Sequence, residues 1–360
     1  MASPITTTTQ IAGPVNFVFQ QTLLRNAKAR CPYFVGSTPA EISEHMGTFS
    51  AKWRRVENLT PVTTALSALT GNLSIPTRDA VQPSVTDPTA TASKYGNHIL
   101  LNEEVDLINF NGQAQKLTEI LGINAGRSLN RLQRNELEDN ATIYYGKTAG
   151  FSTGGAVTDT VTKITRNGIA LLVNVLDRND GMKFTPMGTG STNVGTSPLR
   201  DSYWGICHVD VEYDIRQLTG FIAVEQYAGY TETAKGEFGA VAGVRWLSTS
   251  EATVDADSGG SLGSTGLRST SGTLIDTYPC PIFAMDAVGS LGLDFKFGKE
   301  VYNAGDKLPP VMMINHPKGS AGALDPMNEL ATMGWKAWHA AKILNTNWIK
   351  TLVCGATNIT

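Results

Sequence analysis

The most regular pattern of apolar and polar positions in the chain runs from Gln113 to Tyr145. Apolar residues recur there mostly every three or four positions and charged residues fill the other faces, which is typical of an amphipathic helix. At about 1.5 Å per residue, such a helix would be roughly 50 Å long. We therefore predict a helix that needs a large surface to lie along.

Shorter patterns predict three elements in the middle of the chain. Residues Ile164 to Arg178 have the spacing of an amphipathic helix, and the apolar run from Tyr203 to Cys207 is typical of a buried strand. Asp210 is placed to cap a short helix from Val211 to Leu218, which Gly220 would end.

The second half of the chain contains further strand patterns. Residues Gly243 to Leu247 predict a strand, and Tyr278 to Leu293 predict a strand, a turn and then a short helix or strand. The Ser- and Gly-rich stretch Ala256 to Thr273 predicts a flexible, solvated loop. Helix and strand patterns each fit part of Gly334 to Ala356.

The first hundred residues are organised differently. Residues 1 to about 45 contain little sustained periodicity, which predicts an arm that becomes ordered only against a partner. Alternating positions predict strands at Gly47 to Leu59 and Ala92 to Leu101. More than 30 residues rich in Pro, Thr and Ser separate these strands. This pattern predicts an extended hairpin rather than a compact domain.

Composition favours a protein that meets other proteins. Hydrophobic residues make up 41% of the chain, but charged residues only 17%, below the roughly 25% of an average globular protein. The net charge of −3 argues against a basic nucleic-acid platform. The densest basic stretch is Lys52 to Arg55, and we retain single-strand binding there only as a minor alternative.

Targeting and cross-linking signals are weak. The N-terminal residues lack the charged and apolar regions of a secretory signal, and the chain has no run of about 20 apolar residues. We therefore expect cytoplasmic synthesis and no membrane. The cysteines lie far apart, which argues against a disulfide framework or a zinc site. They are Cys31, Cys207, Cys280 and Cys354.

Catalytic chemistry has one candidate location. His208 lies beside Cys207 and two residues before Asp210, a set that would suit a nucleophile or a triad. Neighbouring strand residues point to opposite faces, so Cys207 and His208 would not share a proton. No G-x-S-x-G elbow accompanies the set. The five histidines are scattered, and no phosphate-binding loop is complete. We expect no catalytic residue, no metal and no cofactor.

Three segments in a fixed order carry a family resemblance. The first is H-x-D-V-x-x-D-I-R followed by G-E-x-G-x-x-x-G-V-R, the second Y-P-x-P-I-F-A-M-D-A-V-G, and the third G-W-K-A-W-H-A-A-K-I-L-N. Together they resemble the major capsid proteins of tailed phages of the coliphage N-four type. Val288 and His339 depart from the family pattern. The motif positions are His208, Asp210, Asp214, Arg216, Gly243, Arg245, Asp286, Trp335 and Trp338.

The resemblance implies the α+β fold of tailed-phage capsid proteins, often called the Hong Kong 97 fold. Its parts would be an N-terminal arm, an extended β-hairpin loop, a peripheral domain with a long spine helix, an axial domain, and C-terminal strands that complete the peripheral domain. The corresponding ranges are 1–46, 47–101, 102–161 with the helix at 113–145, 162–326 and 327–360.

The resemblance also implies a structural function rather than an enzymatic one. The chain would be a major capsid protein that self-assembles into hexamers and pentamers. These would form the icosahedral head that encloses double-stranded DNA without sequence-specific binding. We expect assembly in the host cytoplasm, location in the virion, and a separate scaffolding protein and a portal as partners, with a decoration protein as a further candidate. The predicted inter-subunit contacts are Trp53, Arg54, Arg55, Arg127, Arg131 and Arg134.

Three alternatives stay open at this point. The Thr- and Gly-rich composition would also suit a tail or fibre protein, although no internal repeat is present. A hydrolase would use His208 and Asp210. A cargo-enclosing bacterial nanocompartment has the same fold as the capsid proteins, and its shell protein is the hardest of the three to distinguish from them.

Overall fold

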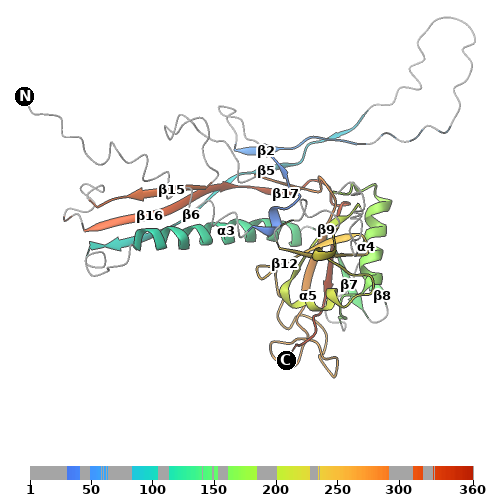
Figure 1. The fold of residues 1–360 in the computed structure, drawn as a ribbon. Helices are drawn as coiled ribbons and strands as arrows, with labels where there is room; N and C mark the ends of the chain where they lie inside the picture. The colour runs from blue at the N-terminus through green and yellow to red at the C-terminus, as the bar shows by residue number, and fades with distance from the viewer. Residues whose placement is uncertain are drawn as a thin grey trace, which may run out of the picture.

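The computed structural model has an elongated part and a compact part that meet side by side (Figure 1). The elongated part is a three-stranded sheet with a long helix, and the compact part is an eight-stranded sheet with two shorter helices. The structure describes residues 31–40, 49–57, 59, 61, 63, 83–103, 113–139, 141–147, 150–152, 161–184, 201–227, 234, 236–291, 311–318, 327 and 329–359.

The compact part is built on a mixed sheet. Strand β9 runs parallel to β12 and antiparallel to β13, and β18 runs antiparallel to β13 and parallel to β7. The last strand of the chain therefore lies inside the sheet. In order across the sheet the strands are β10 (Ile222–Ala223), β11 (Glu237–Val241), β12 (Val244–Thr249), β9 (Tyr203–His208), β13 (Tyr278–Phe283), β18 (Ile349–Cys354), β7 (Thr142–Lys147) and β8 (Gly150–Ser152).

Both faces of the eight-stranded sheet are covered. One face packs against α4 (Arg166–Arg178) and α5 (Val209–Arg216) in a core that includes Trp246. The other face packs against Leu137 of the long helix and Tyr33 from the beginning of the described chain. Because water reaches neither face, β9, β13 and β18 are almost continuously buried instead of alternating between buried and exposed positions.

The elongated part is a sheet in the order β15 (Val311–His316), β16 (Leu330–His339) and β6 (Ser93–Asn102), all antiparallel. Helix α3 (Gln113–Asp139) packs along one face of it, where Leu121, Leu129 and Trp335 belong to a common core. No helix among the described residues is long and apolar enough to cross a membrane.

The long helix is shorter than its sequence pattern predicts. It ends at Asp139, and Thr142–Lys147 forms strand β7 instead of continuing the helix to Tyr145. Ile143, Tyr144 and Tyr145 are β-branched or aromatic residues, which favour strands. They pair in parallel with β18, a strand more than 200 residues further along the chain that a local pattern does not reveal.

Helix α5 also begins differently from the prediction. It covers Val209–Arg216, and its N-cap is His208 rather than Asp210. The Nδ1 atom of His208 accepts a hydrogen bond of 3.1 Å from the backbone N–H of Asp210. The predicted cap was wrong because an imidazole can take the capping role that is usual for Asp or Ser.

The Ser- and Gly-rich stretch from Ala256 to Thr273 is held by two carboxylates. Asp276 accepts hydrogen bonds from the backbone N–H groups of Asp257 and Thr270, and Asp257 accepts from the backbone and hydroxyl of Ser271. The predicted solvent exposure is confirmed for most positions from Ser261 to Thr273, and these hydrogen bonds hold parts of the backbone locally.

The chain forms an extended hairpin, but the predicted strand Ala92 to Leu101 is not its second strand, because β6 pairs with β16 instead. Strand β2 (Ser50–Lys52) pairs antiparallel with β5 (Thr89–Thr91), and β3 (Arg55–Val56) pairs antiparallel with β4 (Val85–Thr86). The chain then continues from β5 into β6 of the three-stranded sheet. The hairpin thus leaves the body of the molecule as a two-stranded ribbon (Figure 1).

Residues 31–40 are ordered against their own chain. A short 3₁₀ helix, η1 (Pro32–Phe34), lies on α3, where the backbone N–H of Tyr33 donates to the side chain of Asn130 at 3.1 Å. Strand β1 (Thr38–Pro39) then pairs in parallel with β14 (Val288–Ser290), which pairs with β17 (Ala341–Ile343). For this segment, the prediction of an arm ordered only by a partner was wrong. Residues 1–30 and 41–46 of the predicted arm lie outside the described residues.

The division into peripheral and axial domains stays a prediction, but strand pairing bears on its boundaries. The boundary at residue 326 separates β15 from β16, although the two strands pair in one sheet. The range 102–161 contributes β7 and β8 to the eight-stranded sheet, and the range 327–360 contributes β18. A division that follows the sheets therefore assigns β7 and β18 to the compact part and β15 to the elongated part.

Candidate assembly surfaces

The root of the hairpin is anchored by an indole ring. Trp53 is 8% exposed and packs in a small core with Ala51, Ala92 and Leu291. Its ring lies directly on Gly289, where an added Cβ would be only 2.5 Å from the ring. The Trp53 side chain is therefore buried against residues of its own chain.

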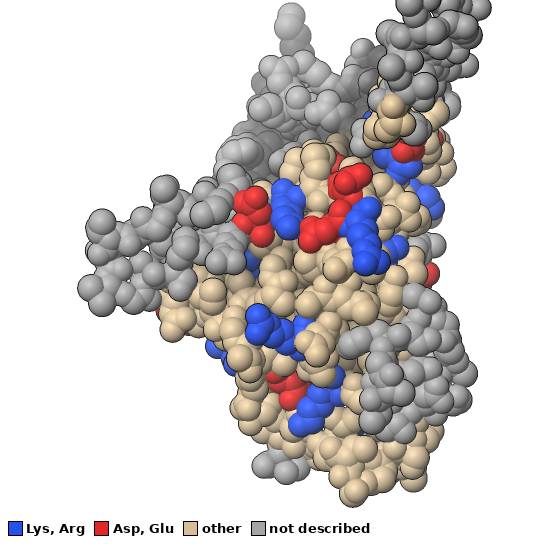
Figure 2. Space-filling model, turned by 90° about the vertical axis from the view of Figure 1, so that its right-hand side faces the viewer, with Lys and Arg blue, Asp and Glu red and all other residues tan. Residues whose placement is uncertain are grey.

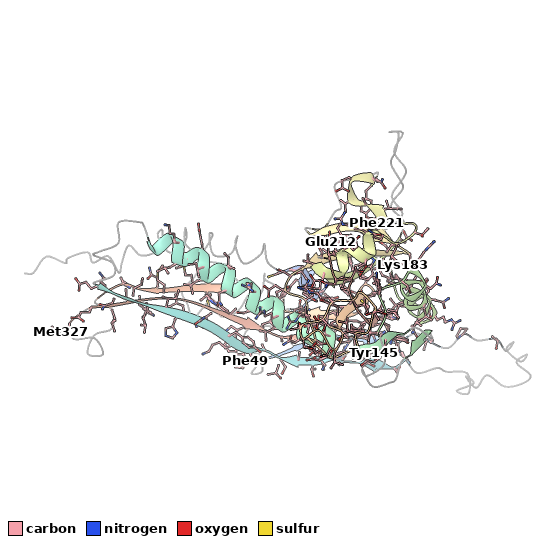
Figure 3. All side chains as sticks on the ribbon, turned by 90° about the horizontal axis from the view of Figure 1, so that it is seen from below. Phe49, Tyr145, Lys183, Glu212, Phe221 and Met327 are labelled. Carbon is pink, nitrogen blue, oxygen red and sulfur yellow. The ribbon has the colours of Figure 1, made fainter. Side chains whose placement is uncertain are left out.

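A second aromatic contact lies beside this anchor. Phe49 stacks on Trp338 of β16, with 5.0 Å between ring centroids and 4° between ring planes. In Figure 3, Phe49 lies near the junction of the two parts, and Met327 lies at the far end of the elongated part. Phe49 and Trp338 thus join the hairpin root to the sheet.

The charged groups of the hairpin are paired along the ribbon. Asp87 binds Lys52 at 3.0 Å and Arg54 at 3.1 Å, and hydrogen bonds from these two cations lower the pKa of Asp87 to about 2. Arg55 binds Glu57 and donates to the backbone carbonyl of Leu344 at 3.0 Å. Arg55 therefore ties the ribbon to the body, whereas the side chain of Arg54 is 70% exposed.

The hairpin also carries an uncovered apolar pair. Val56 of β3 lies opposite Val85 of β4, and the two residues are 60% and 50% exposed. A two-stranded ribbon is marginally stable alone in water. Among the described residues, no third strand pairs with β3 and β4. This section of the ribbon therefore lacks a buried apolar face that would stabilise it.

The three-stranded sheet has a second face, opposite α3. Leu100 and Leu330 are exposed on it, and Gly334 leaves a low point between His98 and Ile314 on the neighbouring strands. A groove of about 460 Å³ follows this face. Its charged rim is basic, formed by Lys94 and Lys336.

Three arginines of α3 converge on one residue, Glu251. Arg127 and Arg131 bind the two oxygens of Glu251 at 2.6 and 2.8 Å, and Arg134 donates to its backbone carbonyl at 2.7 Å. Burial acts to raise the pKa of Glu251, but hydrogen bonds and charge from Arg131 and Arg127 outweigh it, so the pKa lies below its usual value. These arginines, predicted as inter-subunit contacts, have partners within the chain and fasten α3 to the loop after β12.

The first family motif contains a buried ion pair. Arg245 and Glu237 are 3% and 0% exposed at their side chains, and two hydrogen bonds of 2.7 and 2.6 Å join them. The guanidinium also lies 4.3 Å from the ring centroid of Trp204. Ala242 and Gly243, both with positive φ (53° and 83°), form the tight turn that aligns β11 with β12. These residues therefore hold the sheet together.

His208 and Asp210 belong to a polar network at the end of β9. Asp210 accepts hydrogen bonds from the hydroxyl of Tyr278 at 3.0 Å and binds Arg268 at 3.0 Å. Burial lowers the pKa of His208, and its Nδ1 already accepts the cap hydrogen bond. Burial also raises the pKa of the Cys207 thiol well above its usual value. This geometry suits a structural cap and does not suit a nucleophile with a general base.

Other motif residues make equally local contacts. Asp214 accepts hydrogen bonds from the backbone and hydroxyl of Thr357, which holds the C-terminal segment on α5. Arg216 binds Glu212 one helical turn earlier, at 2.7 Å. Asp286, with a φ of 57°, accepts from the hydroxyl of Thr38 at 2.8 Å.

Trp335 completes the set of motif contacts. Its Nε1 donates to the side chain of Asn124 on α3 at 2.9 Å, so the indole pins the helix to β16. Among the described residues, no three His, Cys, Asp or Glu side chains are placed to share a metal ion. On the face seen in Figure 2, acidic and basic side chains occur in small groups of both signs among uncharged surface.

Sequence reasoning missed several partners of these residues. Glu237 stands within the quoted G-E-x-G motif, yet the motif alone does not reveal its pairing with Arg245 eight residues later. Glu251 and Tyr33 carry no motif, and they become visible only when α3 is placed in space. Their contacts are between residues about 100 or more positions apart, such as the 3.0 Å hydrogen bond from Tyr33 to Glu138.

Comparisons with known proteins identify the fold. No protein-family model and no curated protein matches the sequence. Among solved structures, the capsid of Ralstonia phage GP4 matches with a TM-score of 0.61 at 11% identity, over 92% of this chain and 91% of that chain. The capsid of cyanophage Pam1 matches with a TM-score of 0.51 at 12% identity, over 92% and 94%.

An encapsulin is similar as well. The SrpI encapsulin from Synechococcus elongatus matches with a TM-score of 0.51 at 8% identity, over 92% of this chain and 91% of that chain. At such identities, the likeness establishes the fold and not the activity. The chain has the Hong Kong 97-like fold of tailed-phage major capsid proteins, which confirms the fold predicted from the three motifs.

Proposed function

We propose that this chain is the major capsid protein of a tailed phage. Copies of it would assemble into hexamers and pentamers that form an icosahedral head around double-stranded DNA. The observation that carries the proposal is the match to the Ralstonia phage GP4 capsid over nine-tenths of both chains. Its location would be the virion, after assembly in the host cytoplasm.

The hairpin supports self-assembly in particular. Its ribbon has the exposed pair Val56 and Val85, and the sheet face opposite α3 has Leu330 exposed and Leu100 exposed in a groove. Burial of apolar area on a second copy would stabilise both surfaces. We propose that the ribbon of one copy lies on the body of the next copy. Head-to-tail contacts of this kind close into rings when the rotation between copies allows it.

The predicted contact residues now separate into two groups. Arg54 is the strongest candidate for a contact with a neighbouring copy, because its side chain stays 70% exposed although it binds Asp87. Trp53 and Arg55 attach the root of the hairpin to the body of the chain, and the arginines of α3 bind Glu251. We propose that this second group acts indirectly, by fixing the directions of the hairpin and of α3.

A direct test is electron microscopy of purified material. The chain would be produced alone and together with the proteins encoded beside it, which we propose include a scaffolding protein and a portal. We expect closed isometric shells when the scaffolding protein is present. A chain that stays monomeric under both conditions would contradict the proposal.

A nanocompartment shell is the second candidate, because the SrpI encapsulin matches almost the whole chain. It would form closed shells without scaffolding and enclose a protein rather than DNA. The neighbouring genes separate the two functions. A terminase and a portal gene would favour the phage head, whereas an adjacent enzyme with a shell-binding tail would favour the nanocompartment.

A further inference from the structure

His339 lies at the joint between four segments of the chain. It is the last residue of β16 and pairs with Ser93, where the hairpin enters β6. The next residue, Ala340, accepts a backbone hydrogen bond of 2.9 Å from Leu291. The imidazole ring lies 5.6 Å from the ring of Phe34 in η1. The His339 side chain also has a hydrogen bond with the backbone of Leu291, so it contacts β16, the start of β6, η1 and the segment after β14.

The imidazole is enclosed without a partner for one of its nitrogens. The residue is only 4% exposed, and within the described part of the chain its Nε2 has no hydrogen-bond partner. A cavity of about 430 Å³ adjoins it, between the hairpin root, α3 and β17. Opening this joint would bring water to the ring.

No carboxylate near His339 forms an ion pair with it among the described residues. On α3, Glu136 binds Lys342 of β17 at 3.6 Å and accepts from the backbone N–H of Ile343 at 3.4 Å, and Asp139 lies on the surface at the same cavity. The hairpin root contributes only Thr and Ala to the cavity, and β6 contributes Tyr95. An imidazolium in the closed joint would thus have no counter-ion, and its Nε2 would have no hydrogen-bond partner among the described residues.

We propose that His339 is an acid-sensitive latch that holds the hairpin root and residues 31–40 against the three-stranded sheet while it is neutral, and releases them when it is protonated. The proposal concerns the single chain and does not depend on shell formation. The chemical trigger is a proton, and the moving parts are β5, η1 and the start of β17.

The sign of the effect follows from the two states. Burial lowers the pKa of His339 from 6.5 to about 4 in the closed joint. In an open joint the ring would meet water and regain its ordinary pKa, so the open state binds the proton more strongly. The closed state is fully favoured above pH 6.5, and its advantage falls as the pH drops from 6.5 towards about 4.

Hydrogen exchange measured by mass spectrometry on the full chain tests the latch. Protection factors, corrected for intrinsic exchange, would be compared between neutral pH and about pH 4. In the wild type, we expect protection of 89–93 and 339–343 to fall by roughly tenfold or more, since each unit of pKa difference allows a tenfold shift of the opening equilibrium. Strands β9 and β13 should keep their protection. Equal loss there, or no loss at the joint, would overturn the proposal.

Two variants and one control make the test specific. His339→Phe keeps a ring beside Phe34 without a titrating group, and His339→Gln replaces the ring with a smaller polar side chain that does not titrate. Both should lose the acid response of the joint, and a response that persists in either would overturn the proposal. His98→Gln, at an exposed position of β6, should behave as the wild type, and loss of the response there would also overturn it.

A direct titration keeps the test decisive if both variants fail to fold. The ring protons of His339 can be followed by nuclear magnetic resonance in the wild-type chain with labelled histidine. We expect a midpoint near 4, as burial in the closed joint requires. A midpoint near 6.5 in the folded chain would show that the closed joint accepts the proton, and the latch would be refuted.

Discussion

The eight-stranded sheet and the hairpin bury their apolar residues by different means. Strands such as β13 and β18 are buried along their whole length by elements of the same chain. In the hairpin, only the root is covered by its own chain, and the ribbon beyond it leaves Val56 and Val85 exposed. The sheet thus buries its apolar residues within one chain, whereas the hairpin ribbon leaves apolar residues exposed. This contrast is what one chain needs if it folds alone and then joins copies of itself.

The largest expected change in stability concerns the buried ion pair in the sheet. Arg245→Met should lower the free energy of unfolding by about 3–5 kcal/mol, because it leaves the Glu237 carboxylate buried and unpaired. Urea unfolding measures the change. The double variant Arg245→Met with Glu237→Met should recover most of the loss, since no lone charge remains. If the double variant is as unstable as the single one, the loss of stability does not come from an unpaired Glu237 carboxylate.

The second test separates the hairpin from the sheet. Trp53→Ala should cost about 3 kcal/mol at the hairpin root, as is usual for a buried aromatic side chain. Hydrogen exchange should increase at 49–57 and 89–92 while β9 and β13 stay protected. Gly289→Ala is the matched control, because its Cβ would displace the same indole without removing it. An equal effect on the sheet would contradict the separation of the two regions.

A smaller effect is expected where α3 meets the loop after β12. Glu251→Gln removes the charge that Arg127 and Arg131 share, and both arginines are half-exposed. The free energy of unfolding should fall by about 1 kcal/mol, and salt should reduce the difference. Thermal unfolding at low and high salt measures this, with Glu225→Gln on η3 (Val224–Gln226) as a control. A salt-independent loss would mean that packing rather than charge joins these elements.

The smallest effect on stability should accompany a large effect on assembly. Replacing Val56 and Val85 by Thr keeps β-branched residues on the ribbon, so the free chain should change by less than about 0.5 kcal/mol. Shell formation, followed by sedimentation, should be strongly reduced. Val254→Thr, an exposed valine outside the hairpin, is the matched control. Normal assembly of the double variant would remove the ribbon from the proposed contact.

The sequence predicted elements where one local period dominates and missed features that depend on distant partners. The heptad-like spacing along α3 and the apolar runs of β9 and β13 were sufficient to place these elements. The end of α3 at Asp139 was missed because β7 is chosen by pairing with β18, more than 200 residues away. The cap at His208 depends on one side-chain hydrogen bond and the loop at Asp257 on several, and the spacing of apolar residues does not reveal such bonds.

The contacts of the predicted motif and contact residues were likewise missed where they join separate elements of the fold. The residue types were found from motifs, but the partners of Arg245, Trp53 and Arg131 were not, because each contact joins separate elements. The order of three motifs nevertheless predicted the fold, since such a pattern samples β9, β13 and β16 together.

The central claim is that a second copy of this chain covers the hairpin ribbon. Its most direct test is to compare amide exchange of residues 50–57 and 85–91 between the free chain and purified particles under the same conditions. The account predicts rapid exchange in the free chain and strong protection in particles, with unchanged exchange in β9 and β13. Identical exchange of the ribbon in both forms would contradict it.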